Sequence, residues 1–186
     1  MKKFIIVAAL ESEFFPLSGN CPKIYYTGIG KINASRLITH LIIEERPDLV
    51  LNVGTAGCLQ KESLGGVFGV KDVIERDMIA EPLAPRGTVP LSNQPSILIS
   101  DFGTARCATG DSFVTTKDYW LIENSVNLVD MELFAVTKIA QHYGVKWRAI
   151  KFASDLADEN AAEHWNDSLP NANKRISAMM EQALSF

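Results

Sequence analysis

Four short stretches of the chain are predominantly apolar, and we expect them to form strands. They are residues 4–10 (FIIVAAL), 48–54 (DLVLNVG), 96–101 (SILISD) and 147–154 (WRAIKFAS). A strand that helices cover on both faces has no polar side, so its sequence is continuously apolar rather than alternating. The pattern therefore predicts a largely parallel sheet that is buried between helices.

Between the predicted strands, apolar residues recur at the spacing of a helix. Three sets follow this spacing: Ala34, Leu37, Ile38, Leu41 and Ile42; Val136, Ile139, Ala140 and Tyr143; and Ile176, Met179, Met180, Ala183 and Leu184. The first set ends before Pro47 and the second at Gly144, a residue suited to end a helix. The third predicts a last helix that begins at Asp167 or Ser168, just ahead of Pro170. Strands that alternate with helices predict an α/β fold.

Length, composition and charge narrow the class of protein. The chain has 186 residues, 47% of them hydrophobic and 22% charged, which is typical of a globular protein. This length predicts a single domain over residues 1–186. The net charge of −4 gives no general attraction to nucleic acid, although a small nucleoside can still bind through local groups. No apolar run approaches the ~20 residues that a membrane span needs.

The cysteines and the first apolar run indicate a reducing compartment. Cys21, Cys58 and Cys107 are odd in number and lack the paired spacing of a zinc or redox motif, so we expect buried or partly buried thiols. The run at 4–10 follows two lysines, as in a signal peptide, but it is short and Glu11 follows it directly. A buried strand explains it better. We therefore expect a cytoplasmic protein without a membrane partner.

Acidic residues follow several of the predicted strands. Glu13 comes after the first strand, Asp155 after the last, and Glu132 opens a helix after the short run 127–131. A glycine-containing segment, residues 54–57, follows the second strand. Because ligands collect at the carboxyl ends of the strands in an α/β sheet, these segments are expected to converge there.

Converging carboxylates suit the cleavage of a glycosidic bond. Such a reaction needs an acid for the leaving group, a base for water, and negative charge near the developing ribosyl cation. The competing interpretation is that these acids only stabilise helix starts, where the helix dipole favours negative charge.

The glycines allow two interpretations. Gly28 and Gly30 precede a predicted helix in TGIGKINAS (27–35), but the segment lacks the full dinucleotide-binding fingerprint. Gly54 and Gly57 are interpreted as part of a turn, which can serve either sharp turning or a close approach of backbone amides to a ligand.

Six stretches together resemble the nucleoside phosphorylase and nucleosidase superfamily, in particular its methylthioadenosine/S-adenosylhomocysteine nucleosidases. They are VAALESE (7–13), TGIGKINAS (27–35), PDLVLNVGTAGCL (47–59), TGDSFV (109–114), VDMELFAV (129–136) and FASDLAD (152–158). The resemblance implies a three-layer α/β fold with a mixed, mostly parallel sheet flanked by helices. It also implies hydrolysis of the N-glycosidic bond of a purine-type nucleoside, with no cofactor and no metal.

The resemblance further implies roles for the acids. Glu13 would polarise the attacking water, and Asp155 would protonate the five-membered ring of the purine. Glu132 would hold the ribose hydroxyls, while Met131 packs against the sugar. Taken by itself, Met131 is by default a core residue.

Other matched positions would bind the substrate: Thr55, Ala56, Gly57, Phe113, Val114 and Trp165. Segment 55–57 would line the ribosyl and water side, Phe113 would stack on the base, and the Val114 backbone would read the edge of the base. Trp165 would close over the ligand. Without the resemblance, Phe113 and Trp165 are typical of core or surface aromatics, and Thr55 of a helix cap.

The chain departs from the family pattern at several places. Only residues 14–26 stand where the family usually has a β-hairpin. Lys151 replaces an arginine and loses its two-pronged geometry, and Gly57-Cys58 replaces a double glycine. The substrate thus stays open among methylthioadenosine, S-adenosylhomocysteine and futalosine-like nucleosides.

Other functions are weighed against hydrolysis. A phosphorylase of the same superfamily would use phosphate, which requires cationic and amide donors. The acidic ESEFF (11–15) argues against phosphate, although Lys31, Lys151 or Arg86 could rebuild an anion pocket. A non-catalytic nucleoside-binding relative would have no need of both Glu13 and Asp155.

A metal site and a homodimer are also considered. Five residues could supply metal ligands: Asp155, Asp158, Glu159, Glu163 and His164. A solvated acidic loop is the commoner explanation, and we expect no metal. The proline-rich loop 81–95, the apolar helix faces and the resemblance predict a homodimer.

Overall fold

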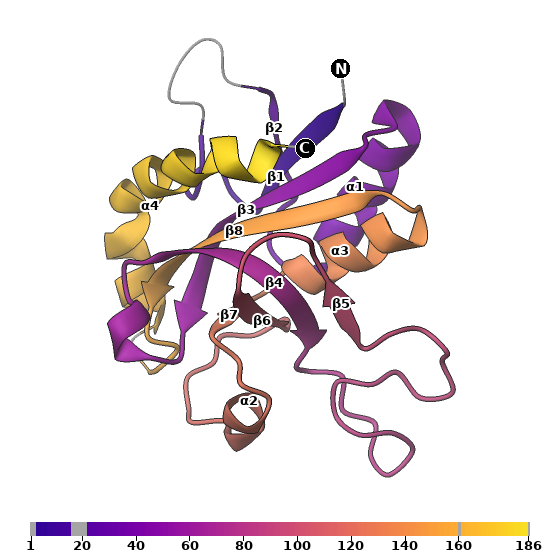
Figure 1. Cartoon of the computed structure of the whole chain (residues 1–186). Coiled ribbons are helices and arrows are strands. Elements are labelled where there is room, and N and C mark those ends of the chain that lie inside the picture. Colours follow the sequence, from indigo (N-terminus) through magenta and orange to yellow (C-terminus); the bar gives the residue numbers. More distant parts are fainter. Residues whose placement is uncertain (1–2, 16–21, 160, 186) are drawn as a thin grey trace.

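A mixed β-sheet lies between helices on both of its faces (Figure 1). The computed structural model describes residues 3–15, 22–159 and 161–185. The strands are β1 (Phe4–Ala8), β2 (Ile24–Tyr26), β3 (Leu49–Cys58), β4 (Val67–Glu75), β5 (Ile97–Ile99), β6 (Ala105–Thr109), β7 (Leu128–Asp130) and β8 (Lys146–Asp155). The helices are α1 (Lys31–Glu45), α2 (Tyr119–Glu123), α3 (Leu133–His142) and α4 (Ala161–Leu184), with a short 3₁₀ helix at Lys61–Ser63.

Strand β3 pairs with three other strands of the sheet. It pairs in parallel with β1 and with the whole length of β8, and its last residues, Gly57 and Cys58, pair antiparallel with β7. From β8 the pairing continues through β4 and β6 and returns to β7, so these strands form a closed circuit. Most pairings are parallel, while β7, β5 and β8 each make an antiparallel contact. The predicted α/β fold with a flanked sheet is confirmed, and the sheet is mixed.

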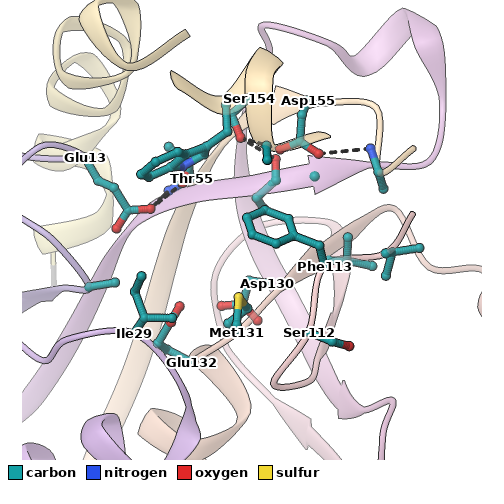
Figure 2. Close-up of a pocket in the computed structure, with 18 of the residues that line it drawn as sticks. Glu13, Ile29, Thr55, Ser112, Phe113, Asp130, Met131, Glu132, Ser154 and Asp155 are labelled. Carbon is teal, nitrogen blue, oxygen red and sulfur yellow. Dashed lines mark hydrogen bonds between the residues drawn. The ribbon is translucent and has the colours of Figure 1, made fainter. Parts of the chain in front are cut away.

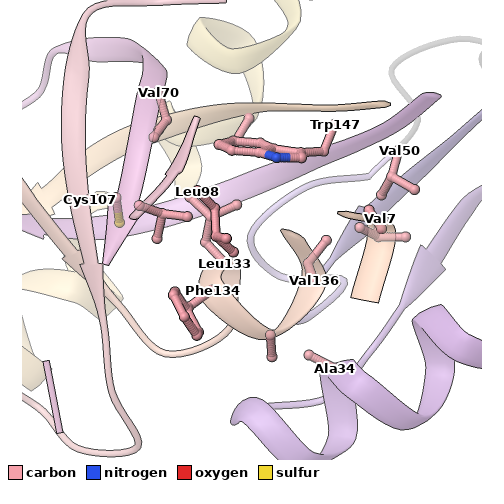
Figure 3. Packing of buried hydrophobic residues seen from close by; sticks show 14 of the residues in the cluster. Val7, Ala34, Val50, Val70, Leu98, Cys107, Leu133, Phe134, Val136 and Trp147 are labelled. Atoms are coloured by element: carbon pink, nitrogen blue, oxygen red, sulfur yellow. The ribbon is translucent and has the colours of Figure 1, made fainter. Parts of the chain in front are cut away.

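The helices cover opposite faces because successive side chains of a strand point to opposite sides. In β1, Ile5 and Val7 belong to the apolar cluster under α1 and α3 (Figure 3), whereas Ile6 and Ala8 belong to the cluster under α4. Burial on both faces explains why the sequence of β1 is apolar throughout.

The predicted start of the last helix is wrong. Helix α4 begins at Ala161, and Pro170 lies inside it. Proline removes one helical hydrogen bond, but both flanking segments are anchored. The Ala161 amide donates to the Asp158 carbonyl (3.0 Å), and Ala172 and Ile176 are fully buried in the cluster under α4. Tertiary packing outweighs the local effect of the proline.

The interpretation of residues 54–57 as a turn is also wrong. Strand β3 runs on to Cys58, because these residues continue to pair with β8, with a shift of register between Ala56 and Gly57. Thr55 therefore lies within a strand and caps no helix.

Residues 76–96, all of them described, contain neither helix nor strand, as expected for the proline-rich loop. Several large apolar side chains of this loop are exposed: Ile79, Leu83, Val89 and Leu91. The homodimer stays a prediction, as does the single domain.

Cys21 lies outside the described residues, whereas Cys58 and Cys107 are buried free thiols. None of the described helices combines the length and the apolar run that a membrane crossing requires.

A buried ion pair joins two strands that are not neighbours in the sheet. The Lys151 ammonium of β8 lies 2.8 Å from Oδ2 of Asp130, the last residue of β7, and the side chains are 3% and 1% exposed. Burial by itself would raise the pKa of Asp130, but Lys151 and the Thr109 hydroxyl outweigh it and hold that pKa below its usual value. Burial likewise opposes the charge of Lys151, and Asp130 restores it, so that the pKa of Lys151 is raised.

Replacement of Lys151 by methionine should lower the free energy of unfolding by about 3–5 kcal/mol, because it leaves a buried carboxylate without a counter-charge. The double variant D130N/K151M should recover much of this loss. Urea denaturation at pH 7 measures both. The control is K3M, which breaks the solvent-exposed pair of Lys3 and Glu45 and should change stability far less than K151M. A K151M effect as small as that of K3M would contradict the role given to the pair.

Candidate active site

A cavity of about 290 Å³ opens at the carboxyl ends of β1, β3, β7 and β8 (Figure 2). All the site residues predicted from the sequence line it: Glu13, Thr55, Ala56, Gly57, Phe113, Val114, Met131, Glu132, Asp155 and Trp165. The structure thus brings together residues from six segments of the chain. Their individual roles stay predictions.

Glu13 is held at one side of the cavity by a turn that follows β1. Its side chain is buried, and Oε1 accepts hydrogen bonds from the Thr55 amide (3.2 Å) and the Thr55 hydroxyl. Oε2 accepts a longer hydrogen bond from the Leu10 amide (3.3 Å). The indole N–H of Trp165, on α4, donates to Oγ1 of Thr55 (2.8 Å). A continuous chain of hydrogen bonds therefore leads from α4 to the Glu13 carboxylate.

Asp155 ends β8 at the other side of the cavity and is buried as well. Its carboxylate accepts hydrogen bonds from the Ala157 amide (3.0 Å) and the Ser154 hydroxyl (2.8 Å). Burial outweighs these bonds, so the pKa of Asp155 is raised above its usual value. A β-carbon added to Gly57 would lie 2.7 Å from Oδ1 of Asp155. Gly57 is therefore required for the position of the acid rather than for a turn.

Glu132 stands between two helix starts. It is the residue that precedes α3, and its Oε1 accepts a hydrogen bond from the amide of Gly30, which precedes α1 (2.8 Å). Burial and the nearby charge of Asp130 raise the pKa of Glu132 to about 7. Met131 beside it is half-buried and lines the same wall.

The loop between β6 and α2 supplies the aromatic wall. Phe113 is 50% exposed and Val114 is buried. Arg76, at the end of β4, holds this loop by donating to the Gly110 carbonyl (3.0 Å) and the Ser112 hydroxyl (3.2 Å). Arg76 is not among the residues predicted from the sequence, because β4 was not predicted; its position directly after a strand is the signal that marks it.

The cations that could have formed a phosphate pocket are paired with carboxylates. Lys31 lies 2.6 Å from both Glu75 and Asp77, and Arg86 donates to both carboxylate oxygens of Asp118 (3.1 and 2.6 Å). Lys151 is bound to Asp130. Neither Lys31 nor Arg86 lines the cavity.

The acidic residues around Asp155 do not gather into a metal site. Within residues 3–15, 22–159 and 161–185, no group of three His, Cys, Asp or Glu side chains is placed to hold a metal ion.

Comparison with known proteins identifies the family. The family model of the phosphorylase superfamily matches residues 8–185. The 5′-methylthioadenosine/S-adenosylhomocysteine nucleosidase of Buchnera aphidicola is 28% identical over 179 residues, which cover 85% of this chain and 76% of that protein.

Solved structures agree in fold. The S-adenosylhomocysteine nucleosidase from Streptococcus pyogenes, in complex with 5-methylthiotubericidin, has a TM-score of 0.84 at 21% identity and covers 100% of this chain and 98% of its own. A futalosine hydrolase mutant of Helicobacter pylori has a TM-score of 0.81 at 20% identity, over 98% and 100% of the two chains. Since the family match spans nearly the whole sequence, the chain belongs to the phosphorylase superfamily.

Proposed function

We propose that this protein hydrolyses the N-glycosidic bond of a purine-type nucleoside, with Asp155 as the general acid and Glu13 as the group that activates water. Its sequence relatives are nucleosidases, and the chain is an enzyme of this class. The observation that carries the residue roles is that two buried carboxylates line one cavity in different hydrogen-bonding environments. Such a difference lets one carboxyl hold a proton while the other accepts one.

Asp155 is suited to protonate the leaving base. Burial raises its pKa, which favours the protonated form that a general acid needs. As the bond between the ribosyl carbon and the base nitrogen breaks, its electron pair passes to the base, and the proton of Asp155 neutralises it. The Ala157 amide and the Ser154 hydroxyl then stabilise the carboxylate that remains.

Glu13 is suited to receive a proton from water. The donors from Thr55 and Leu10 fix its orientation at the cavity wall. The oxygen of a water bound there forms the new bond to the ribosyl carbon, and its proton passes to Glu13. The products are the free base and the free sugar. The negative charge of the wall stabilises the ribosyl cation between these two events.

The remaining lining residues would bind the nucleoside. Glu132 and Met131 would contact the ribose, and Phe113 and the Val114 backbone would contact the base. Segment 55–57 would line the ribosyl and water side, with Trp165 over the ligand. Because the relatives include methylthioadenosine/S-adenosylhomocysteine nucleosidases, and a futalosine hydrolase shares the fold, these nucleosides are the candidate substrates.

The charges of the cavity favour water over phosphate. Among the described residues that line the cavity, the only lysine or arginine is Arg76. Its guanidinium is bound to Ser112 and Gly110. Glu13, Glu132 and Asp155 would oppose an incoming anion. This arrangement supports a hydrolase over a phosphorylase.

A nucleoside panel tests the proposal. Methylthioadenosine, S-adenosylhomocysteine, futalosine and inosine would be incubated with the protein, with and without phosphate, and the products separated by chromatography. We expect free sugar in both conditions, and about a 10²–10⁴-fold loss of rate in D155N and E13Q, the range for loss of an acid or base. Sugar 1-phosphate would indicate a phosphorylase, no turnover would support a binding protein, and wild-type rates in both variants would contradict the assigned roles.

Replacement of Gly57 by alanine should nearly abolish turnover while the fold is kept. The added methyl group would meet the Asp155 carboxylate at 2.7 Å and displace it. The matched control is Gly54→Ala in the same strand, whose methyl group meets Glu13 only at 3.4 Å. Rates and circular dichroism spectra would be compared. Equal rates for the two variants would show that the approach of Gly57 to Asp155 has no functional importance.

The pKa of Glu132 predicts a pH dependence of stability. Because this pKa is about 7 in the folded protein and 4.5 ordinarily, the folded state binds the extra proton between these values. The favourable contribution of this group is full below about pH 4.5 and is lost as the pH rises to 7. E132Q should therefore gain stability relative to wild type over this range, by up to about 3 kcal/mol.

Urea denaturation of both proteins between pH 4.5 and 8 measures the gain. The control is Glu44→Gln, which removes one carboxylate from the exposed side of α1. A difference between E132Q and wild type that stays constant with pH would refute the raised pKa.

A further inference from the structure

The hydrogen bond between Trp165 and Thr55 joins the first turns of α4 to the middle of the site. The indole Nε1 lies 2.8 Å from Oγ1 of Thr55. An indole N–H can only donate, so the Thr55 oxygen must be the acceptor. The side chain of Trp165 is half-buried against the cavity, where its ring is also part of the wall.

This bond determines where the Thr55 hydroxyl hydrogen points. A threonine hydroxyl carries a single hydrogen, and its oxygen can accept from other donors. Because the Thr55 oxygen accepts the indole N–H, the hydroxyl hydrogen is directed to Oε1 of Glu13, which the hydroxyl contacts. Without the indole, the hydroxyl would be free to rotate toward water in the cavity.

The two oxygens of Glu13 are consequently unequal. Oε1 accepts both the amide and the hydroxyl of Thr55. Oε2 accepts from the Leu10 amide at 3.3 Å, which is longer than a usual N–H···O bond. Since a carboxylate oxygen has two lone pairs, Oε2 retains the capacity to take a proton.

We propose that Trp165 is a positioning residue for the reaction: through the Thr55 hydroxyl, its indole N–H holds Glu13 so that Oε2 receives the proton of the attacking water. This inference rests on the proposed function and adds a specific task for α4. In the step itself, the water O–H bond breaks, the proton passes to Oε2, and the water oxygen bonds to the ribosyl carbon. The indole and the hydroxyl keep their own hydrogens.

Kinetics of W165F and T55V test the proposal. Phenylalanine keeps an aromatic wall and removes the N–H, while valine keeps the shape of threonine and removes the hydroxyl. We expect each variant to lower kcat about ten-fold, as for the loss of one hydrogen bond, with KM within about two-fold. The double variant should be no slower than T55V, because both act through one chain, and T55S, which restores a hydroxyl at this position, should be faster than T55V.

The matched control is W120F, since Trp120 is also half-buried but does not line the cavity. It should leave kcat unchanged. An unchanged kcat in W165F, or a double variant about a hundred-fold slower than wild type, would overturn the proposal. The first result would leave Trp165 as a wall of the pocket, and the second would mean that Trp165 and Thr55 act independently.

An NMR experiment separates this inference from the proposed function. The indole N–H signal of Trp165, assigned by its loss in W165F, should shift and exchange faster with water in T55V but not in T55S. E13Q should shift the same signal in the wild-type background and leave it in place in the T55V background. The signals of Trp120 and Trp147 serve as internal references. If T55V did not fold, T55A would replace it.

These signals do not require turnover. If the protein cleaved no nucleoside, the proposed function would fail, while the shifts would still establish the chain from Trp165 to Glu13. If turnover occurred but T55V left the Trp165 signal unchanged, the positioning role would fail and the proposed function would stand.

Discussion

The buried pair of Asp130 and Lys151 connects the parts of the sheet that carry the site. β7 and β8 are not paired with each other, yet Met131 and Glu132 follow β7 while Asp155 ends β8. The ion pair holds the two strands at a fixed separation from inside the circuit. Asp130 also accepts the Leu133 amide (2.9 Å) and so orients the start of α3. Displacement of this pair would move Met131 and Glu132 as well as Asp155.

Strand β3 also positions the site, because it contacts both the Glu13 and the Asp155 carboxylate. Thr55 donates to Glu13, whereas Gly57, two residues later, leaves room for Asp155. The shift of register after Ala56 separates these two environments within a single strand. One continuous backbone segment thus supplies donors to Glu13 and space to Asp155, and a flexible turn would not hold both in place.

The sequence was sufficient to predict the buried strands β1, β3 and β8 and the acids at their ends, because continuous apolar runs and strand-end positions are local features. Strands β4 and β6 were missed because charges interrupt their apolar pattern. Asp72 and Arg106 pair across these strands at 2.5 Å, a contact that only the folded sheet reveals. The same limit applies to Lys151, whose partner lies on a strand that is not its neighbour. The local preference of Pro170 to begin a helix was overridden by the packing of α4 on the sheet. Gly57 was taken for part of a turn, although it lies in a strand where a side chain would meet Asp155.

The electrostatics of the cavity favour acid–base chemistry on a neutral substrate. Glu13, Glu132 and Asp155 are all buried around one cavity, where negative charge is costly because little water solvates it. Burial raises the pKa of both Glu132 and Asp155, with a smaller contribution from the charge of Asp130 at Glu132 and of Asp158 at Asp155. The lysines and arginines that could neutralise this negative charge are bound to other carboxylates or to the loop at Gly110. A developing ribosyl cation would transiently compensate this negative charge. The charge that makes this wall unfavourable in the free protein therefore becomes favourable as the glycosidic bond breaks.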